Sequence, residues 1–248
     1  MKRLFLYLSV LILAFLISVP RGVTSSFDFI STVKVPKKSL KLFYDIYWGP
    51  FLVGKSEIVI TPNFYESKVF TAGIGSWFFH FVAIWKTYVF PDGHPKKVII
   101  WGKKWGKERQ KRILFLPKEG KVIIVLSKPP KKGHPRTYAL KYPVYDELSA
   151  FVAAFYIDYK KHPRVVLPLF IRHFYSQVKL ELKGEKDLKG EKCYKVLVKL
   201  PKVSELLRRS SRVEVFLSEK RRIPLVLKSS LPIFGSLVGV LQRVVTSP

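Results

Sequence analysis

The chain has 248 residues, of which 48% are hydrophobic, and 45 Lys and Arg against 17 Asp and Glu give a formal charge of +28. This hydrophobic content excludes a disordered chain and is enough for the core of one large domain or two small ones. The only cysteine, Cys193, excludes a disulfide framework within the chain and a cysteine-rich zinc site, and we expect no disulfide partner.

The N-terminus has the order of a secretory signal peptide. Met1-Lys2-Arg3 is a cationic start, Leu4–Val19 is apolar apart from two serines, and Gly22–Ser26 is small and polar. Because the apolar run is shorter than the roughly 20 residues of a membrane-spanning helix, residues 1–26 are interpreted as a cleaved signal peptide. An uncleaved anchor in the inner membrane is the alternative. Both alternatives predict that residues 27–248 form a single exported domain in the periplasm.

Most of the exported part alternates between apolar and polar residues, which is typical of antiparallel strands with one wet face. Leu40–Trp48 and Ser56–Thr61 flank a break at Gly49-Pro50 and predict a hairpin. Similar runs downstream bring the expectation to roughly ten to twelve strands. Two further apolar stretches, Gly73–Trp85 and Leu231–Leu241, are interpreted as buried pieces of the core.

One segment keeps a helical period instead. Apolar side chains recur at the spacing of a single helix face, which predicts a helix near Asp146–Tyr159 with Asp146 or Tyr145 at its cap; these side chains are Leu148, Phe151, Val152, Phe155, Tyr156 and Tyr159. A second, shorter helix is predicted at Trp77–Val82. The expected fold is mainly β: one curved antiparallel sheet or incomplete β-barrel, with the amphipathic helix packed on its concave side.

Three landmarks, in this order, resemble an exported bacterial family known as domain of unknown function 3108. They are Tyr44-Asp45-Ile46-Tyr47-Trp48-Gly49 with Gly54, then Tyr145–Ser149, then Phe216–Lys220 with Arg222-Ile223-Pro224. The resemblance covers roughly Leu40–Leu241. Phe216 stands where the family usually has tryptophan, and Lys220 stands where it usually has a second acidic residue. The resemblance implies a fold and an exported location but no reaction.

Motifs that would carry chemistry are absent from the sequence. Five scattered histidines form no metal-ligand spacing, and there is no nucleophile elbow, P-loop or dinucleotide-binding loop. The Asp146-Glu147-Leu148-Ser149 segment could offer a carboxylate and a hydroxyl to a cleft, but its position favours capping of the helix. We therefore expect no metal, no cofactor and no enzymatic activity. An envelope enzyme whose site is assembled only in space is the alternative.

A segment that interleaves aromatic and basic residues lies between positions 101 and 112. Three interpretations are open: a solvated hairpin, a contact with an anionic lipid or envelope polymer, or nucleic-acid binding. Because an exported protein meets little nucleic acid, we expect no nucleic-acid partner. The residues proposed for contact with an anionic surface are Trp101, Lys103, Lys104, Trp105, Lys107, Arg109, Lys111 and Arg112.

The leading functional hypothesis is a non-catalytic binding or carrier module for an apolar or amphipathic envelope molecule. It is based on many one-faced strands, one apolar helix and 15% aromatic residues, an architecture similar to that of periplasmic lipid carriers. The helix would supply the ligand contacts, through Leu148, Phe151, Val152 and Phe155. The alternative to a carrier is a structural or assembly factor held at an anionic membrane face.

Overall fold

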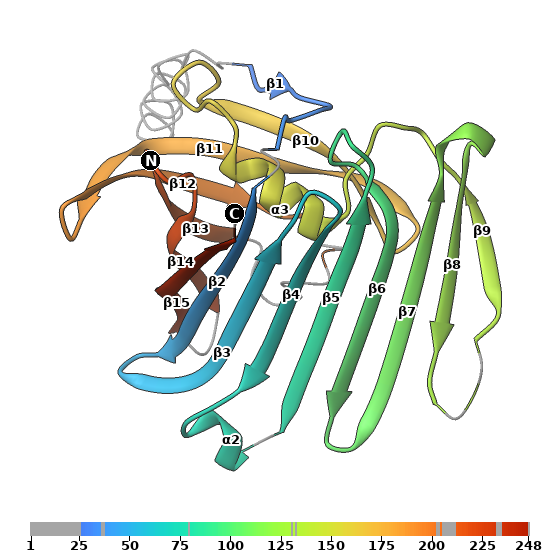
Figure 1. Ribbon diagram of the computed structural model, residues 1–248, viewed down its shortest axis with the longest axis horizontal. Coiled ribbons are helices and arrows are strands. Elements are labelled where there is room, and N and C mark those ends of the chain that lie inside the picture. Colours follow the sequence, from blue (N-terminus) through green and yellow to red (C-terminus); the bar gives the residue numbers. More distant parts are fainter. Residues whose placement is uncertain are drawn as a thin grey trace, which may run out of the picture.

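The chain forms one strongly curved sheet with a helix inside its curve (Figure 1). The computed structural model describes residues 26–35, 38–78, 80–129, 131, 133–201, 204, 212–231 and 235–247. The helices are α2 (Gly75–Phe78) and α3 (Glu147–Phe155), with a 3-10 turn η1 (Pro117–Glu119). The strands are β1 (Asp28–Phe29), β2 (Ser39–Trp48), β3 (Phe51–Ile60), β4 (Phe64–Thr71), β5 (Phe81–Val89), β6 (Pro95–Lys104), β7 (Lys107–Leu116), β8 (Lys121–Ser127), β9 (Pro135–Ala139), β10 (Arg164–Ile171), β11 (Phe174–Leu188), β12 (Glu191–Lys199), β13 (Arg212–Ser218), β14 (Pro224–Leu231) and β15 (Gly235–Ser247).

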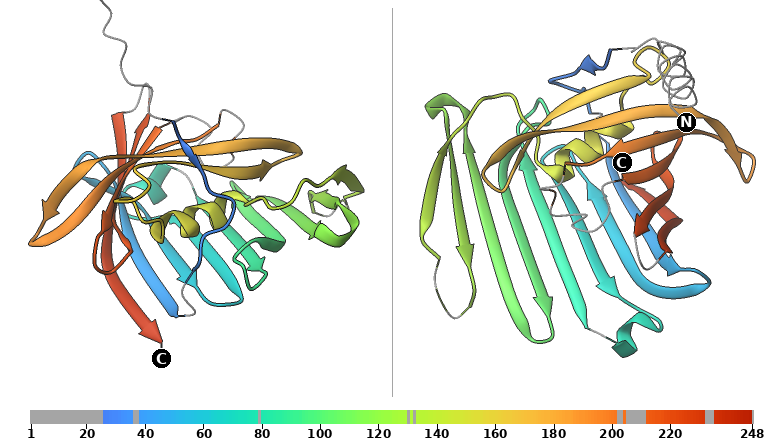
Figure 2. Two further views of the ribbon diagram at one scale, coloured as in Figure 1. Left: turned by 90° about the horizontal axis from the view of Figure 1, so that it is seen from above. Right: turned by 180° about the vertical axis from the view of Figure 1, so that it is seen from behind.

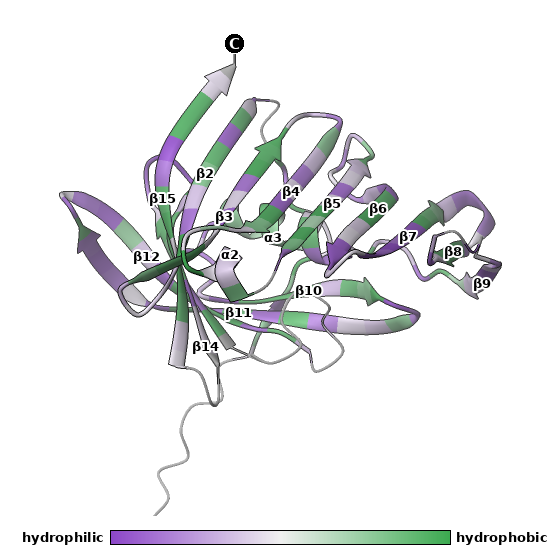
Figure 3. Cartoon of the chain, turned by 90° about the horizontal axis from the view of Figure 1, so that it is seen from below, coloured by the Kyte–Doolittle hydropathy of each residue, from purple (hydrophilic) through white to green (hydrophobic). Residues whose placement is uncertain are grey.

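The sheet is a long meander in two runs. Its strand order is β1-β10-β11-β12-β13-β14-β15-β2-β3-β4-β5-β6-β7-β8-β9, so β15 joins the C-terminal run to β2 of the N-terminal run. The edges β1 and β9 do not pair with each other, and the sheet stays unclosed. Hydrophobic and hydrophilic residues alternate along β2 to β6, as expected for strands with one face on the core (Figure 3). The mainly β prediction with one unclosed curved sheet is confirmed.

Four features of the sheet differ from the sequence-based expectation. The described residues contain 15 strands rather than ten to twelve, and the pairing of β1 with β10 is parallel. Strand β10 was not predicted because its apolar residues are continuous. The structure shows the reason: residues 165–171 are buried without interruption, so this strand has no wet face. The stretch Leu231–Leu241 is not one buried piece, because it contains the end of β14 and the beginning of β15.

Helix α3 lies across the concave side of the sheet, between β10–β12 and the strands β2–β5 (Figures 1 and 2). It contacts β4, β5 and β10. The helix ends four residues earlier than predicted, since Tyr156 is its C-cap. Tyr159 is buried beyond the helix, and its hydroxyl donates to the carbonyl oxygen of Ala154 at 3.0 Å. That bond satisfies one of the carbonyl groups that a helix end leaves without an internal partner.

The short helix forms near the predicted place but with other bounds. Helix α2 covers Gly75–Phe78, and residues from Phe81 onward belong to β5 rather than to the predicted Trp77–Val82 helix. The expectation that Gly73–Trp85 is a buried piece of the core is wrong for four of its described residues, because Gly73, Trp77, Phe78 and His80 are exposed. Residues 1–25, almost all of the expected signal peptide, lie outside the described residues. Among the helices that the structure describes, none has the length and apolar character needed to cross a bilayer.

Candidate binding cavity

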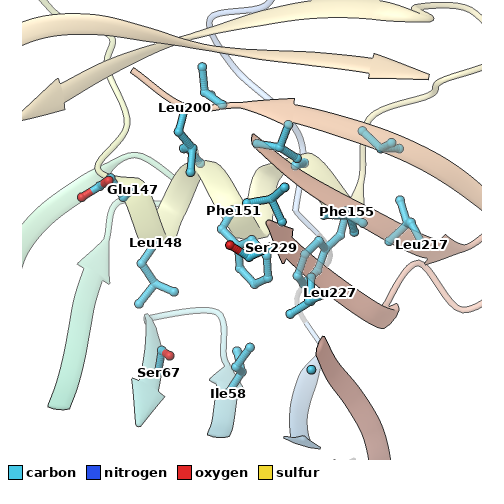
Figure 4. A pocket seen from close by; sticks show the side chains of 18 of the residues that line it. Ile58, Ser67, Glu147, Leu148, Phe151, Phe155, Leu200, Leu217, Leu227 and Ser229 are labelled. Atoms are coloured by element: carbon cyan, nitrogen blue, oxygen red, sulfur yellow. The ribbon is translucent and has the colours of Figure 1, made fainter. Parts of the chain in front are cut away.

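An apolar cavity of about 320 Å³ lies between α3 and the curved sheet and is partly open (Figure 4). Its wall comes from both runs of the sheet, β2–β5 on one side and β10–β15 on the other. The residues that line it are Tyr44, Ile46, Ser56, Ile58, Ser67, Val69, Trp85, Glu147, Leu148, Ala150, Phe151, Ala154, Phe155, Tyr159, Leu169, Val178, Leu180, Val196, Val198, Leu200, Val213, Val215, Leu217, Leu227, Ser229, Leu237 and Gly239. The cavity is thus built by segments far apart in the sequence.

One face of α3 forms the roof of the cavity. Its lining residues fall at 147–148, 150–151 and 154–155, which repeats the spacing of successive helix turns. Three of the four residues predicted to contact a ligand, Leu148, Phe151 and Phe155, line the cavity. The fourth, Val152, is completely buried in the core and does not line it. Phe151 is only partly buried, and its ring lies edge-on to that of Phe155 at 4.8 Å between centroids.

The buried carboxylate of Asp146 fixes the N-terminal end of this roof. It caps α3 by accepting from the backbone N–H groups of Leu148 at 3.4 Å and Ser149 at 3.1 Å. The same carboxylate accepts from Trp85 Nε1 at 2.9 Å and from the Thr87 hydroxyl at 2.7 Å, both on β5. The predicted capping role of Asp146 is therefore confirmed, and the cap also ties the helix to the sheet.

A parallel bridge between Tyr145 and Leu169 holds the residue before this cap against β10. Tyr145 N donates to the carbonyl of Pro168 at 2.9 Å, and Phe170 N donates to the carbonyl of Tyr145 at 2.8 Å. Helix α3 is thus attached at its first turn to both layers that form the cavity wall.

Most polar atoms on the cavity wall have partners within the protein. The Tyr44 hydroxyl donates to the carbonyl of Pro224 at 2.8 Å, and burial raises its pKa. Burial also raises the pKa of Tyr159. Glu147 is buried at the N-terminal end of α3 and accepts a hydrogen bond from the Ser204 hydroxyl. Ser229 differs, because its buried Oγ has no hydrogen-bond partner within the described part of the chain.

Sequence reasoning missed both Glu147 as a wall residue and Ser229. Glu147 belonged to the segment that was assigned to capping, but only Asp146 and Ser149 form the capping box. Ser229 carried no signal, since it lies in β14 between Lys228 and Ser230 and reaches the cavity only through the curvature of the sheet. Figure 4 shows Ser229 and Phe151 among the residues that line the cavity.

The structure places the basic aromatic segment in the hairpin of β6 and β7, outside the cavity wall. Trp101 is partly buried, whereas the turn residues from Lys103 to Lys107 are exposed. Arg109 and Arg112 are exposed and Lys111 is partly buried. Lys103 forms an ion pair with Glu108 across the hairpin at 3.3 Å. The hairpin therefore brings Lys103, Lys104, Trp105 and Lys107 together at its turn.

The described residues hold no group of three or more His, Cys, Asp or Glu side chains that could bind a metal. His94, the one completely buried histidine of that part, lies between Val144 O at 3.0 Å and Thr32 Oγ1 at 3.2 Å. Its burial lowers its pKa, although Asp92 and two backbone groups act in the opposite direction. Cys193 is buried in β12, and burial raises the pKa of its thiol.

The sequence matches the family described as Protein of unknown function (DUF3108) over residues 44–242. The chain belongs to this family, as its three landmarks predicted. No curated protein matches it.

Among solved structures, the chain is similar to a β-barrel-like protein of domain of unknown function DUF1849 from Brucella abortus. The two are 12% identical with a TM-score of 0.54, over 86% of this chain and 99% of that one. Two further matches have much lower TM-scores. A DUF1329 family protein from Desulfovibrio piger is 11% identical, with a TM-score of 0.26 over 84% of this chain and 85% of that one. A LolA superfamily protein from Nitrosomonas europaea is 9% identical, with a TM-score of 0.25 over 86% and 87%. The fold likeness therefore rests on the Brucella abortus protein.

Proposed function

We propose that this protein is a non-catalytic binding or carrier module for an apolar or amphipathic molecule of the cell envelope. The observation that supports this function is the cavity of about 320 Å³ under α3. Ligand pockets in proteins commonly measure about 300–1,000 Å³, and apolar cavities of about 150 Å³ already bind small hydrocarbons. The N-terminal signal-peptide pattern supports a periplasmic location.

The chemistry of the wall supports one class of ligand. Aliphatic and aromatic side chains cover most of it, so a bound apolar chain would be stabilised by about 0.8 kcal/mol for each methylene that leaves water. The hydroxyls of Tyr44 and Tyr159 are already bonded to backbone carbonyls. The Ser229 hydroxyl is the group most available to a polar atom of the ligand. A molecule with an apolar body and a single hydroxyl or ester group fits this arrangement.

The test is a comparison of two Val→Phe variants of the full chain. Val69 lines the cavity, whereas Val245 is exposed on β15 and serves as the matched control. The neutral probe N-phenyl-1-naphthylamine becomes fluorescent when it enters an apolar site. A new phenyl ring at position 69 displaces about two methylene volumes of bound probe, which weakens binding about tenfold.

Thermal unfolding of both variants shows whether they are folded, and Ser67→Leu provides a second way to fill the cavity if Val69→Phe does not fold. Probe binding that is equal in the wild type, the cavity variants and the control contradicts the proposal. Organic extraction of the wild-type protein from a bacterial envelope, followed by mass spectrometry, then identifies the natural ligand.

A further inference from the structure

Three connections of the meander meet at one edge of the molecule. The β2–β3 turn, helix α2 and the β6–β7 turn are all at the bottom of Figure 1, and the view from behind in Figure 2 agrees. This position follows from the topology, since every second connection of an antiparallel meander returns to the same edge. Helix α3 lies further from this edge, and the cavity beside it is lined in part by β2, β3 and β4, the strands that run to these connections.

Large aromatic side chains are exposed at all three connections. Their exposed fractions range from 45% for Trp48 to 83% for Trp77. We call this set the aromatic rim; its members are Trp48, Phe51, Trp77, Phe78 and Trp105. Single exposed apolar residues are ordinary on a protein surface, but a group of large ones on one edge indicates a site of interaction.

The backbone holds the rim in place. Ile74 N donates to Leu52 O at 3.1 Å, which ties the beginning of α2 to the β2–β3 hairpin. A Cβ atom at Gly75 would lie 2.1 Å from the carbonyl oxygen of Val53, so this close approach requires glycine. Trp105 N donates to His80 O at 3.3 Å and ties the β6–β7 turn to the segment after α2. The aromatic side chains are therefore presented by connected turns rather than by separate loops.

The charge at this edge is positive. Lys103, Lys104 and Lys107 are exposed at the β6–β7 turn, and Lys104 Nζ lies 4.5 Å from the centroid of the Trp105 ring. Across residues 48–52, 73–78 and 103–108 of the sequence the one acidic residue is Glu108, which pairs with Lys103 at 3.3 Å, so Lys104 and Lys107 supply the excess positive charge. Tryptophan prefers the headgroup layer of a bilayer, and lysine reaches lipid phosphates from the same depth. The combination matches the surface of an anionic membrane.

The rim also adjoins the cavity. Leu237, a residue of the cavity wall, pairs with Trp48 across β15 and β2. Ile46, two positions before Trp48 on β2, also lines the cavity. The wall therefore extends to the strand ends that carry the rim.

We propose that the aromatic rim docks on a lipid bilayer that contains anionic lipid. This contact presents the lower end of the cavity to the membrane from which a ligand is taken up or to which it is released. Only this last step rests on the proposed function; docking itself does not require a ligand. A lipid surface is the better match, because exposed tryptophan and lysine side chains occur together at this edge.

A fluorescent reporter at each edge of the same chain tests the proposal. Two variants are made in a Cys193→Ser background, one with a single cysteine in place of Lys107 near the rim and one with a single cysteine in place of Lys118 at the opposite edge. Each variant is labelled with the environment-sensitive dye NBD. Both lysines are exposed. Vesicles of phosphatidylcholine with about 30% phosphatidylglycerol should raise NBD emission only at position 107. Vesicles of phosphatidylcholine alone should not, and salt near 1 M should abolish the response, because the screening length falls to about 3 Å.

Two sets of variants identify the groups responsible. Trp77→Ser with Phe78→Ser should abolish the response at position 107, whereas Phe29→Ser with Phe174→Ser, which removes exposed aromatics elsewhere, should preserve it. The double variant Lys103→Gln with Lys104→Gln should bind vesicles more weakly, by about fivefold for each lysine that is replaced. The control Lys189→Gln with Lys192→Gln should bind them as the wild type does.

An equal response at positions 107 and 118, or no response to anionic vesicles at low salt, overturns the proposal. The probe-binding assay with Val69→Phe is independent of these measurements. Rim variants that still bind N-phenyl-1-naphthylamine but no longer respond to vesicles separate docking from the cavity function.

Discussion

Replacement of Asp146 by alanine should remove the attachment between the cavity roof and the sheet. Loss of the helix cap costs about 1 kcal/mol. Each buried donor left without a partner costs about 1–3 kcal/mol, and Thr87 is completely buried, so its hydroxyl has no access to water. Trp85 is only partly buried, so the cost of leaving its ring N–H without a partner is at the lower end of that range. The expected loss in the free energy of unfolding is about 3–5 kcal/mol, a large part of the 5–15 kcal/mol typical of a domain.

Urea unfolding of the full chain measures this loss as a shift of the transition midpoint at constant slope. Asp187→Ala is the matched control, because the exposed Asp187 carboxylate accepts one hydrogen bond, from Gly190 N at 2.8 Å. We expect the control to lose less than about 1 kcal/mol. Thr87→Val should lose an intermediate amount, and its effect should largely disappear in the Asp146→Ala background. Equal losses for Asp146→Ala and Asp187→Ala would refute the idea that this carboxylate holds the roof.

Three further predictions concern single residues. Phe155→Ala should cost about 3–5 kcal/mol of unfolding free energy in urea titrations, whereas Phe151→Ala should cost about 1–2 kcal/mol because Phe151 already faces the cavity. Glu181 accepts a hydrogen bond from Lys183 and lies near Lys199 and Arg164, which together hold its pKa below the ordinary value of 4.5. At pH values above 4.5 the ionised side chain of Glu181 therefore stabilises the fold. The difference in unfolding free energy between the wild type and Glu181→Gln should become smaller as the pH falls through the lowered pKa. Finally, the Cys193 thiol should react with Ellman's reagent only after unfolding, because it is buried and its pKa is raised.

The parts of the fold that could be predicted from the sequence are those whose signals are local. Strand β2 alternates, α3 has a cap and a helical period, and the Gly49-Pro50 turn joins β2 to β3, so each follows from residues close together. Strand β10 was invisible because burial on both faces removes alternation. The exposed Trp77 and Phe78 were misjudged because an apolar stretch indicates burial unless its position at the edge of the sheet is known.

The candidate site was only partly predictable for a different reason. The helical period identified the apolar residues of α3, but it could not distinguish the face toward the cavity from the face toward the core. Val152 lies on the core side, although its spacing suits the same stripe as Leu148 and Phe151. The facing wall comes from strands such as β13, β14 and β15, whose distance from α3 depends on the curvature of the whole sheet. No local pattern records that curvature.

The sizes of the side chains on α3 explain why a cavity remains beneath it. The roof carries Ala150 and Ala154 one turn apart, between the larger Leu148, Phe151 and Phe155. On the core side, Val152 and Ala153 are completely buried. Since protein interiors usually pack without voids larger than a water molecule, an apolar space beside small side chains has a cost in stability. The proposed ligand would offset that cost by filling the space beside Ala150 and Ala154.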